Sequence, residues 1–256
     1  MITSKKDAKV TCISWSPDGE QIICGDVKGM LTQRTPMDGV AQRVIHPAIS
    51  KKHPESFTVL AVNWIEPYTF MAIYGKLPPG EFMYGYGGGG DGLIDNDDES
   101  GNFQTAAYVI TQTSKQAPMH WKYIENPCEA SEFLKRYPGF HFAGISGWGK
   151  NALHLQFLAS AGSAEVMTIA HCLPGILKGG SANGNTPDWN VLDTDPFRAQ
   201  LPMAVVNIDE SNTAPLGMAV DFTGTRMLSS LSTEEESTEP MPPQPILWIL
   251  TTDGCL

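Results

Sequence analysis

A glycine-rich stretch with one lysine has the clearest potential for chemistry. Residues 144–151, GISGWGKN, nearly spell the phosphate-binding pattern G-x-x-x-x-G-K-[ST]. Asn151 stands where that pattern has the hydroxyl that holds magnesium, and the pattern must open a helix whose N-terminus meets the phosphates. The segment that follows alternates apolar and polar side chains, as a strand does. We therefore expect a β-turn, and a nucleotide hydrolase that uses Gly149 and Lys150 is only a third hypothesis.

The other groups that could bind a metal or a cofactor lack the necessary spacing. The glycine run at 87–90 has no lysine, and the acids that follow it would repel phosphate. Asp95, Asp97 and Glu99 only loosely resemble a calcium loop, because the glycine comes one place late. The six histidines show no H-x-x-x-H spacing, and no serine lies in a G-x-S-x-G frame. The sequence thus predicts no cofactor, no metal, no small-molecule ligand and no catalytic residue.

An arginine among acidic residues is harder to dismiss. Arg198 lies in residues 189–202, WNVLDTDPFRAQLP, and Asp209 and Glu210 follow shortly after. In one interpretation its charge is satisfied by acidic neighbours in the same loop. In the other, a protruding loop offers Arg198 to a carboxylate of a partner protein, where planar bidentate pairing gives specificity. Both interpretations stay open on the residues alone.

Residues 10–36 set the architecture that must position such a loop. They read as three short strands separated by two turns, and the first turn, Ser16-Pro17-Asp18-Gly19, combines a fixed φ, an Asx bond and a glycine that accepts positive φ. A meander with a W-S-P-x-G opening is typical of one blade of a β-propeller. One blade cannot bury both of its faces, so neighbouring blades must follow.

The remaining chain supplies further short strands. We expect them near 40–47, 59–65, 68–74, 103–113, 141–172, 217–223 and 245–252, which amounts to two clear blades, a plausible third and part of a fourth. Residues 76–102, 173–190 and 226–245 are predicted to be mobile loops, and a short helix is possible near 130–137. The fold class is therefore all-β: a WD-repeat-like β-propeller over residues 1–256, with an incomplete set of blades.

Charge and composition exclude several kinds of partner. The net charge is −11 and no run of lysine and arginine exceeds two residues, so direct nucleic-acid binding is not expected. No window approaches 18 consecutive apolar residues, and the first ten residues have no apolar core, so we expect neither a membrane span nor a signal peptide. The five cysteines show no C-x-x-C spacing, which favours reduced, mostly buried thiols. The six tryptophans are expected to pack between blades.

Five segments follow one another in an order that resembles a known family. They are VTCISWSPDGEQIICGDVKG, VLAVNWIEPYTF, W-x-V-L-x(5)-R-A-Q-L-P, PLGMAVDFT and PILWILTTDG. Together they are similar to the N-terminal β-propeller of the cytoplasmic-face FG nucleoporin that docks the DEAD-box helicase of mRNA export. The chain departs from the family in that the first blades of its seven-bladed ring are missing and the last does not complete.

The resemblance implies a non-enzymatic docking domain at the cytoplasmic face of the nuclear pore complex. Its partners would be the N-terminal RecA domain of a DEAD-box RNA helicase and other nucleoporins. By motif match, Arg198 is similar to the arginine before Leu-Pro that contacts the helicase, and Asp209 is a candidate for a polar contact. The alternative is a generic WD-repeat adaptor for other proteins, with no role at the pore.

Overall fold

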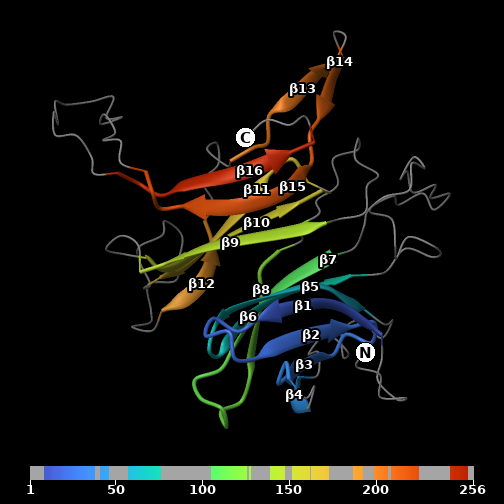
Figure 1. The fold of residues 1–256 in the computed structure, drawn as a ribbon, viewed down its shortest axis with the longest axis vertical. Coiled ribbons are helices and arrows are strands. Elements are labelled where there is room, and N and C mark those ends of the chain that lie inside the picture. Colours follow the sequence, from blue (N-terminus) through green and yellow to red (C-terminus); the bar gives the residue numbers. More distant parts are fainter. Residues whose placement is uncertain are drawn as a thin grey trace.

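The chain folds into stacked antiparallel sheets (Figure 1). The computed structural model describes residues 9–37, 41–45, 57–75, 105–125, 127, 139–147, 152–161, 163–172, 187–192, 199–206, 209–224 and 243–252. Within these residues every regular element is a β-strand, which confirms the all-β class. The helix suggested near 130–137 and the predicted loop at 76–102 lie outside the described residues.

The first sheet is the meander predicted from residues 10–36, closed by a fourth strand. Its strands, in spatial order, are β1 (Val10–Trp15), β2 (Ile22–Asp26), β3 (Leu31–Arg34) and β4 (Ala41–Ile45). In the first turn the Gly19 amide donates to the Ser16 carbonyl at 2.9 Å, and Gly19 takes a φ of 73°. Gly29 takes a φ of 78° in the second turn. Both turns therefore use glycine where a side chain would be strained.

Two more four-stranded meanders and one strand pair follow. The second sheet holds β5 (Thr58–Glu66), β6 (Thr69–Gly75), β7 (Thr105–Thr111) and β8 (His120–Tyr123). The third holds β9 (Phe140–Ser146), β10 (Ala152–Ser160), β11 (Val166–Cys172) and β12 (Asp188–Val191). The fourth pairs β15 (Pro215–Asp221) with β16 (Ile246–Thr251), and β13 (Met203–Val206) pairs with β14 (Asp209–Asn212) as a separate hairpin.

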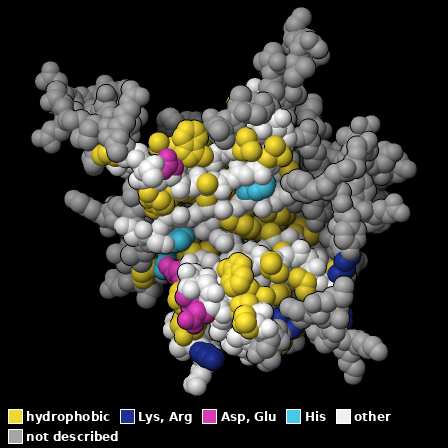
Figure 2. All heavy atoms as spheres, in the orientation of Figure 1, with side chains coloured by type: hydrophobic (Ala, Val, Ile, Leu, Met, Phe, Trp, Pro, Cys, Tyr) yellow, Lys and Arg dark blue, Asp and Glu magenta, His cyan; other side chains and the backbone are white. Residues whose placement is uncertain are grey.

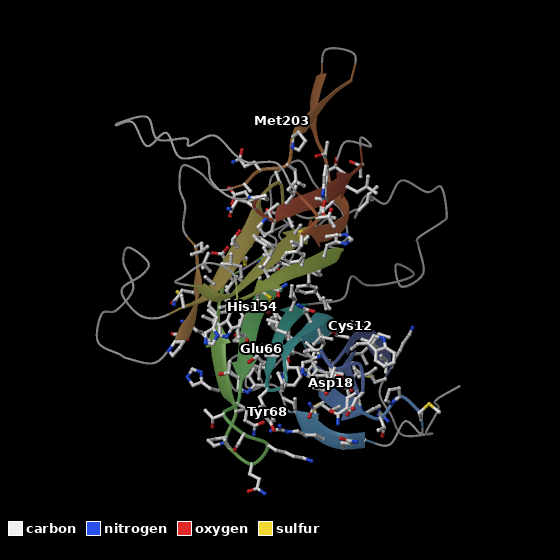
Figure 3. All side chains as sticks on the ribbon, turned by 60° about the vertical axis from the view of Figure 1, so that its left-hand side comes forward. Cys12, Asp18, Glu66, Tyr68, His154 and Met203 are labelled. Carbon is white, nitrogen blue, oxygen red and sulfur yellow. The ribbon has the colours of Figure 1, made fainter. Side chains whose placement is uncertain are left out.

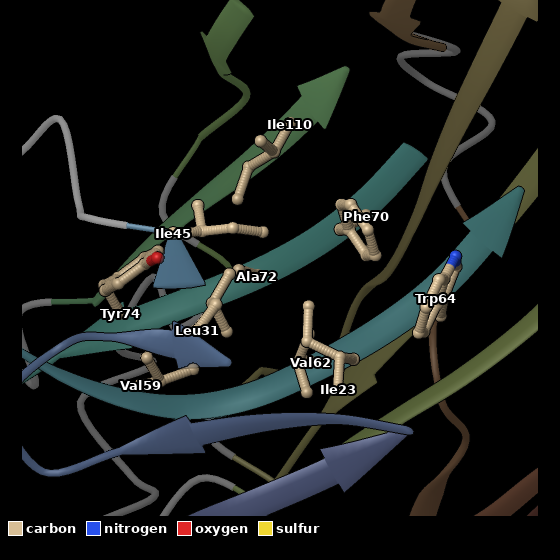
Figure 4. Packing of buried hydrophobic residues seen from close by; sticks show 10 residues of the cluster. All are labelled: Ile23, Leu31, Ile45, Val59, Val62, Trp64, Phe70, Ala72, Tyr74 and Ile110. Carbon is tan, nitrogen blue, oxygen red and sulfur yellow. The ribbon is translucent and has the colours of Figure 1, made fainter. Parts of the chain in front are cut away.

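The second sheet is buried on both faces, because successive side chains of a strand point to opposite sides. Along β6, Phe70, Ala72 and Tyr74 join a cluster with the first sheet, shown in Figure 4. Met71 and Ile73, between them, join a second cluster with the third sheet. Two further clusters join the third sheet to the fourth. Each sheet thus covers the apolar side of its neighbour, as propeller blades do.

The first strands of the sheets lie beside one another and run along one side of the stack. β1 packs against β5, β5 against β9, and β9 against β15. The stack begins with the outward side of β1–β4 and ends with the outward side of β15–β16, at opposite ends of the molecule in Figure 1. The arrangement is an open series of blades, which agrees with the incomplete propeller expected from the sequence.

One predicted loop is too long. The loop proposed for 173–190 is wrong at its end, because β12 begins at Asp188. The reason is Trp189, which is 2% exposed and stacks flat on the imidazole of His171, with ring centroids 4.9 Å apart. Glycine and asparagine dominate the residues just before Trp189, so the composition of this segment predicted a loop and gave no sign of the buried tryptophan. Of the loop predicted at 226–245, only 243–245 are described, and they are not part of a strand.

Cysteine and tryptophan positions agree only partly with expectation. Cys12, Cys24 and Cys172 are free thiols, and the last two are buried. Trp64 and Trp189 are buried between sheets as expected. Trp15 and Trp248, which are 55% and 41% exposed, instead lie on the outward sides of the first and fourth sheets. None of the described residues belongs to a helix long and apolar enough to cross a membrane.

Candidate docking site

A hairpin, β13–β14, projects beyond the stack (Figure 1), and the predicted arginine precedes it in the sequence. The chain enters it through residues 199–202, which run alongside the start of β11. The Val166 amide donates to the Ala199 carbonyl at 2.9 Å, and the Leu201 amide donates to the Ala164 carbonyl at 2.7 Å. The side chain of Leu201 is 7% exposed and packs in the cluster between the third and fourth sheets. Leu201 therefore fixes the first leg of the hairpin to the core.

The second leg is fixed in a similar way. Thr213 is 2% exposed, and its hydroxyl donates to the Pro202 carbonyl at 2.7 Å, so the two legs are tied together at the base. The neighbouring Ala214 donates its amide to the Thr252 hydroxyl at 3.1 Å and accepts from the Thr252 amide at 2.9 Å. The hairpin thus stands on a base that is hydrogen-bonded to the third and fourth sheets. Met203, labelled in Figure 3, is 58% exposed just above this base.

The structure describes only one of the two predicted contact residues. Arg198 lies outside the described residues, and the described chain resumes at Ala199. Asp209 is the first residue of β14 and pairs with Val206, next to the hairpin turn. Its backbone is therefore at the far end of the hairpin from the Ala199–Leu201 anchor. The assignment of both residues to a contact remains a prediction.

Sequence reasoning missed the hairpin itself. Residues 203–206, MAVV, are apolar and partly β-branched, and residues 209–212 follow after two intervening positions. Two short runs separated by two residues are a hairpin signal. The signal was weak because the intervening Asn-Ile lacks the glycine that favours a tight hairpin turn.

The glycine-lysine stretch is a strand end where it is described. Gly144 lies within β9 and pairs with Gln156 of β10, and Gly147 follows the strand with a φ of 66°. The next described element, β10, is a strand antiparallel to β9, whereas the phosphate-binding pattern requires a helix after its lysine. A Cβ at Gly144 would lie 2.9 Å from both Gln156 Oε1 and His154 Nε2. The glycine makes room for those two side chains, whereas Gly149 and Lys150 lie outside the described residues.

Those side chains form a buried polar cluster between the second and third sheets. Ser146 Oγ and His154 Nδ1 are 2.8 Å apart, and His154 Nε2 lies 3.3 Å from Gln156 Oε1. Since an amide oxygen only accepts, Nε2 of the imidazole carries a proton. Burial lowers the pKa of His154, although Glu66, across the sheet junction in Figure 3, acts in the opposite direction. His154 is 4% exposed, so the cluster is structural rather than open to a substrate.

No group of three metal-binding side chains occurs among the residues that the structure describes. The described part of the chain thus offers a stack of blades and one projecting hairpin. These features define the class: a β-propeller-like stack of blades with a projecting hairpin.

The chain belongs to the family described as the NUP159/214 β-propeller, which matches residues 2–256. Among curated proteins, it is 26% identical over 250 residues to the nuclear pore complex protein Nup214 of Homo sapiens, covering 96% of this chain and 10% of that protein. It is 23% identical over 250 residues to nucleoporin nup146 of Schizosaccharomyces pombe, covering 97% of this chain and 16% of that one. The relatives are thus nucleoporins, of which this chain spans a small part.

Two solved structures share the fold. The crystal structure of the N-terminal domain of Nup159 superposes with a TM-score of 0.57 at 17% identity, covering 98% of this chain and 55% of that one. A chain in the structure of S. cerevisiae dbp5 bound to nup159, gle1, IP6 and ADP superposes with a TM-score of 0.59 at 20% identity, covering 96% of this chain and 53% of that one. The chain therefore has the propeller fold of these neighbours over about half their length.

Proposed function

We propose that this chain is a docking domain at the cytoplasmic face of the nuclear pore complex that binds a DEAD-box RNA helicase and thereby supports mRNA export. It acts by binding and has no catalytic activity of its own. The observation that carries the proposal is membership of the nucleoporin propeller family, together with the likeness to a structure in which dbp5 is bound to nup159.

The β13–β14 hairpin is the element that we propose to contact the helicase. A binding element that is anchored before it meets its partner loses less conformational entropy on association. Leu201 and Thr213 fix the two legs of the hairpin by burial and hydrogen bonding. Arg198 immediately precedes the first leg in the sequence, and Asp209 begins β14. Arg198 is proposed to pair with a carboxylate of the helicase's N-terminal RecA domain.

The test is binding of the purified chain to the DEAD-box mRNA-export helicase of the same organism, measured by calorimetry. Reversing the charge with Arg198→Asp should weaken binding by at least tenfold, since disrupting an interfacial charge pair costs about 2–5 kcal/mol. Lys28→Asp is the matched control, because Lys28 is exposed in the turn between β2 and β3 and the change in net charge is the same. Equal affinity of the two variants would refute the site.

Location at the pore is tested separately. Immunogold labelling of the tagged chain in cells should place it at the nuclear rim, on the cytoplasmic side of the pores. A diffuse distribution, with helicase binding absent in calorimetry, would favour the generic adaptor over the nucleoporin. Helicase binding that persists without rim labelling would refute the location but not the docking site.

A further inference from the structure

An arginine at the junction of the first two sheets is held in place but has no acidic partner. Arg43 of β4 faces the second sheet, because it pairs with Gln33, which in turn pairs with the fully buried Ile23. Its half-buried guanidinium donates from Nη1 to Gln112 Oε1. A guanidinium has five N–H donors, so others remain for a further partner. Among the residues that the structure describes, no carboxylate forms an ion pair with Arg43.

Gln112 can orient the arginine because it is itself held by the backbone around it. It is 8% exposed, and its amide N–H donates to the Tyr68 carbonyl at 3.0 Å. Its side-chain Nε2 donates to the carbonyls of Lys115, at 3.3 Å, and of Ala117. These bonds bring three segments together: β4, the turn between β5 and β6, and the turn between β7 and β8. Tyr68 and Lys115 therefore belong to the same small surface as Arg43, which we name the blade-junction site.

The three side chains of the blade-junction site suit a carboxylate ligand. Tyr68 is 41% exposed at the tip of its turn, near the lower end of the second sheet in Figure 3, and Lys115 is exposed as well. A planar guanidinium can pair with a carboxylate through two parallel hydrogen bonds, and the lysine adds a second positive charge. Tyrosine and arginine are also the residue types that contribute most of the binding energy at many interfaces.

The nearby acidic side chains are engaged elsewhere. Glu66 accepts a hydrogen bond from the Thr69 hydroxyl at 3.2 Å. Thr69 points away from the first sheet, because the next residue, Phe70, packs towards it. The Asp18 carboxylate, in the turn between β1 and β2, accepts hydrogen bonds from a hydroxyl and an amide of its own turn. The positive charge of Arg43 is therefore available to a carboxylate from another molecule.

We propose that the blade-junction site binds an acidic segment of a partner protein, with a glutamate or aspartate of that segment paired to Arg43 and the adjoining residue packed on Tyr68. An extended polyanion such as RNA is a poor ligand, because the chain has a net charge of −11. The described lysine and arginine side chains on the face shown in Figure 2 also lie in small separate groups and form no continuous basic surface. A short acidic segment needs only the local positive charge.

The site is separate from the helicase-docking hairpin, which is fixed to the third and fourth sheets. The test is a titration of the ¹⁵N-labelled chain with the acetylated peptide GEEEEG, followed by NMR. The Arg43 Nε–H and the Gln112 side-chain amide should shift saturably, and the neutral peptide GQQQQG should leave both signals in place. Arg43→Gln should weaken binding about tenfold, as expected for loss of charge-assisted hydrogen bonds. Lys115→Gln should weaken it about twofold to threefold, because an exposed charge contributes less.

Lys28→Gln is the matched control, since Lys28 is exposed in the turn between β2 and β3 and the change in net charge is the same. Urea midpoints establish that each variant is folded, and Lys115→Gln removes only an exposed side chain, so it tests the site even if Arg43→Gln is unstable. Absence of shifts at millimolar peptide, or equal affinity of the Lys115→Gln, Arg43→Gln and Lys28→Gln variants, would overturn the proposal. A single-stranded RNA that shifts the same signals at lower concentration than GEEEEG would overturn the assignment to a protein partner.

Discussion

The hydroxyl of Ser14 accepts a hydrogen bond from the backbone amide of Trp64 at 3.0 Å, and so joins the first strands of two successive sheets. Sheets packed only by apolar contacts could slide, whereas this bond fixes the relative position of β1 and β5. The neighbouring Thr11 hydroxyl donates to the Val59 carbonyl at 2.5 Å in the same junction. The relative position of the first two sheets therefore depends on polar side chains of β1 as well as on the hydrophobic cluster between the sheets.

Removing the Ser14 hydroxyl should be costly for its size. Ser14→Ala leaves the Trp64 amide without its partner, and an unsatisfied buried donor costs about 1–3 kcal/mol. Ser14→Thr keeps an acceptor at the same place and should retain most of the stability. Urea unfolding of the two variants is the measurement. A loss in Ser14→Thr as large as in Ser14→Ala would mean that the hydrogen bond is not the source of stability.

Trp64 and Trp15 form a natural pair for testing blade packing. Trp64 is 6% exposed, packs at a tilted angle against Phe70 with ring centroids 5.0 Å apart, and donates its indole N–H to the Glu66 carbonyl at 2.8 Å. Trp64→Ala should therefore lower the free energy of unfolding by about 3–5 kcal/mol. Trp15→Ala, one sheet earlier, should cost less than about 1 kcal/mol, because Trp15 is 55% exposed. Similar losses in the two variants would contradict the exposure of Trp15.

The same pair shows what sequence patterns can predict here. Alternation in residues 153–157 and in the VTCISW and VLAVNW segments predicted strands, because side-chain direction follows directly from strand geometry. It could not predict that one tryptophan is buried and the other exposed, since that depends on whether a neighbouring sheet covers the face. The local sequence pattern determines to which side of the sheet a residue points. Whether that side is covered depends on the order in which the sheets stack.

The missed elements share a different cause. β8 and β12 have four residues each, too short for alternation to be distinguished from chance. Both are held by contacts from elsewhere in the chain: Lys122 of β8 pairs with Asp188 of β12 at 2.5 Å, and Trp189 stacks on His171. The candidate site was located from the sequence only as the arginine motif. The hairpin beside it depends on anchors at Leu201 and Thr213, which lie 12 positions apart and become neighbours only on folding.

At Gly25 the backbone of the first sheet lies close to the second sheet. A Cβ there would lie 2.6 Å from Val59 Cγ1 and 2.7 Å from Cys12 Sγ, distances that require the sheets to separate. Gly25→Ala should lower stability by about 1–3 kcal/mol through overpacking. Gly139→Ala is the control, because its nearest atom would be 3.9 Å away. Thermal or urea unfolding of both variants provides the test, and a Gly25→Ala variant as stable as its control would show that the junction is loosely packed.

Cys12 should be a poor nucleophile in the folded chain. Burial raises the pKa of its thiol to about 11, despite hydrogen bonding that favours the thiolate. An unfolded cysteine has a pKa of about 8.5, so the thiolate fraction at pH 7.5 rises on unfolding. Maleimide labelling followed by peptide mass spectrometry should modify Cys12 at least about tenfold more slowly in native buffer than in urea. Equal rates would mean that β1 opens readily from β5.

His154 should make the stability of the chain dependent on pH. Burial lowers the pKa of His154 in the folded state, and it does the same for His141. An unfolded histidine has a pKa of about 6.5, so below that pH the unfolded chain binds more protons than the folded one. The stabilising effect of keeping His154 neutral is therefore complete above about pH 6.5 and declines as the pH falls towards the folded-state value.

The comparison that isolates His154 uses the His154→Gln variant, which cannot titrate. Free energies of unfolding in urea at pH 7.5 and pH 5.5 should differ less for the variant than for wild type. His141 still titrates in both chains, so the variant retains part of the dependence. In the neutral ring Nε2 faces Gln156 Oε1 and Nδ1 faces the Ser146 hydroxyl at 2.8 Å. Protonation of His154 adds a proton at Nδ1, which then becomes a donor towards that hydroxyl. Ser146→Ala removes that partner and should leave the pH slope of wild type largely in place, since burial is the main cause of the low pKa. A His154→Gln variant with an unchanged slope would assign the dependence to His141 alone.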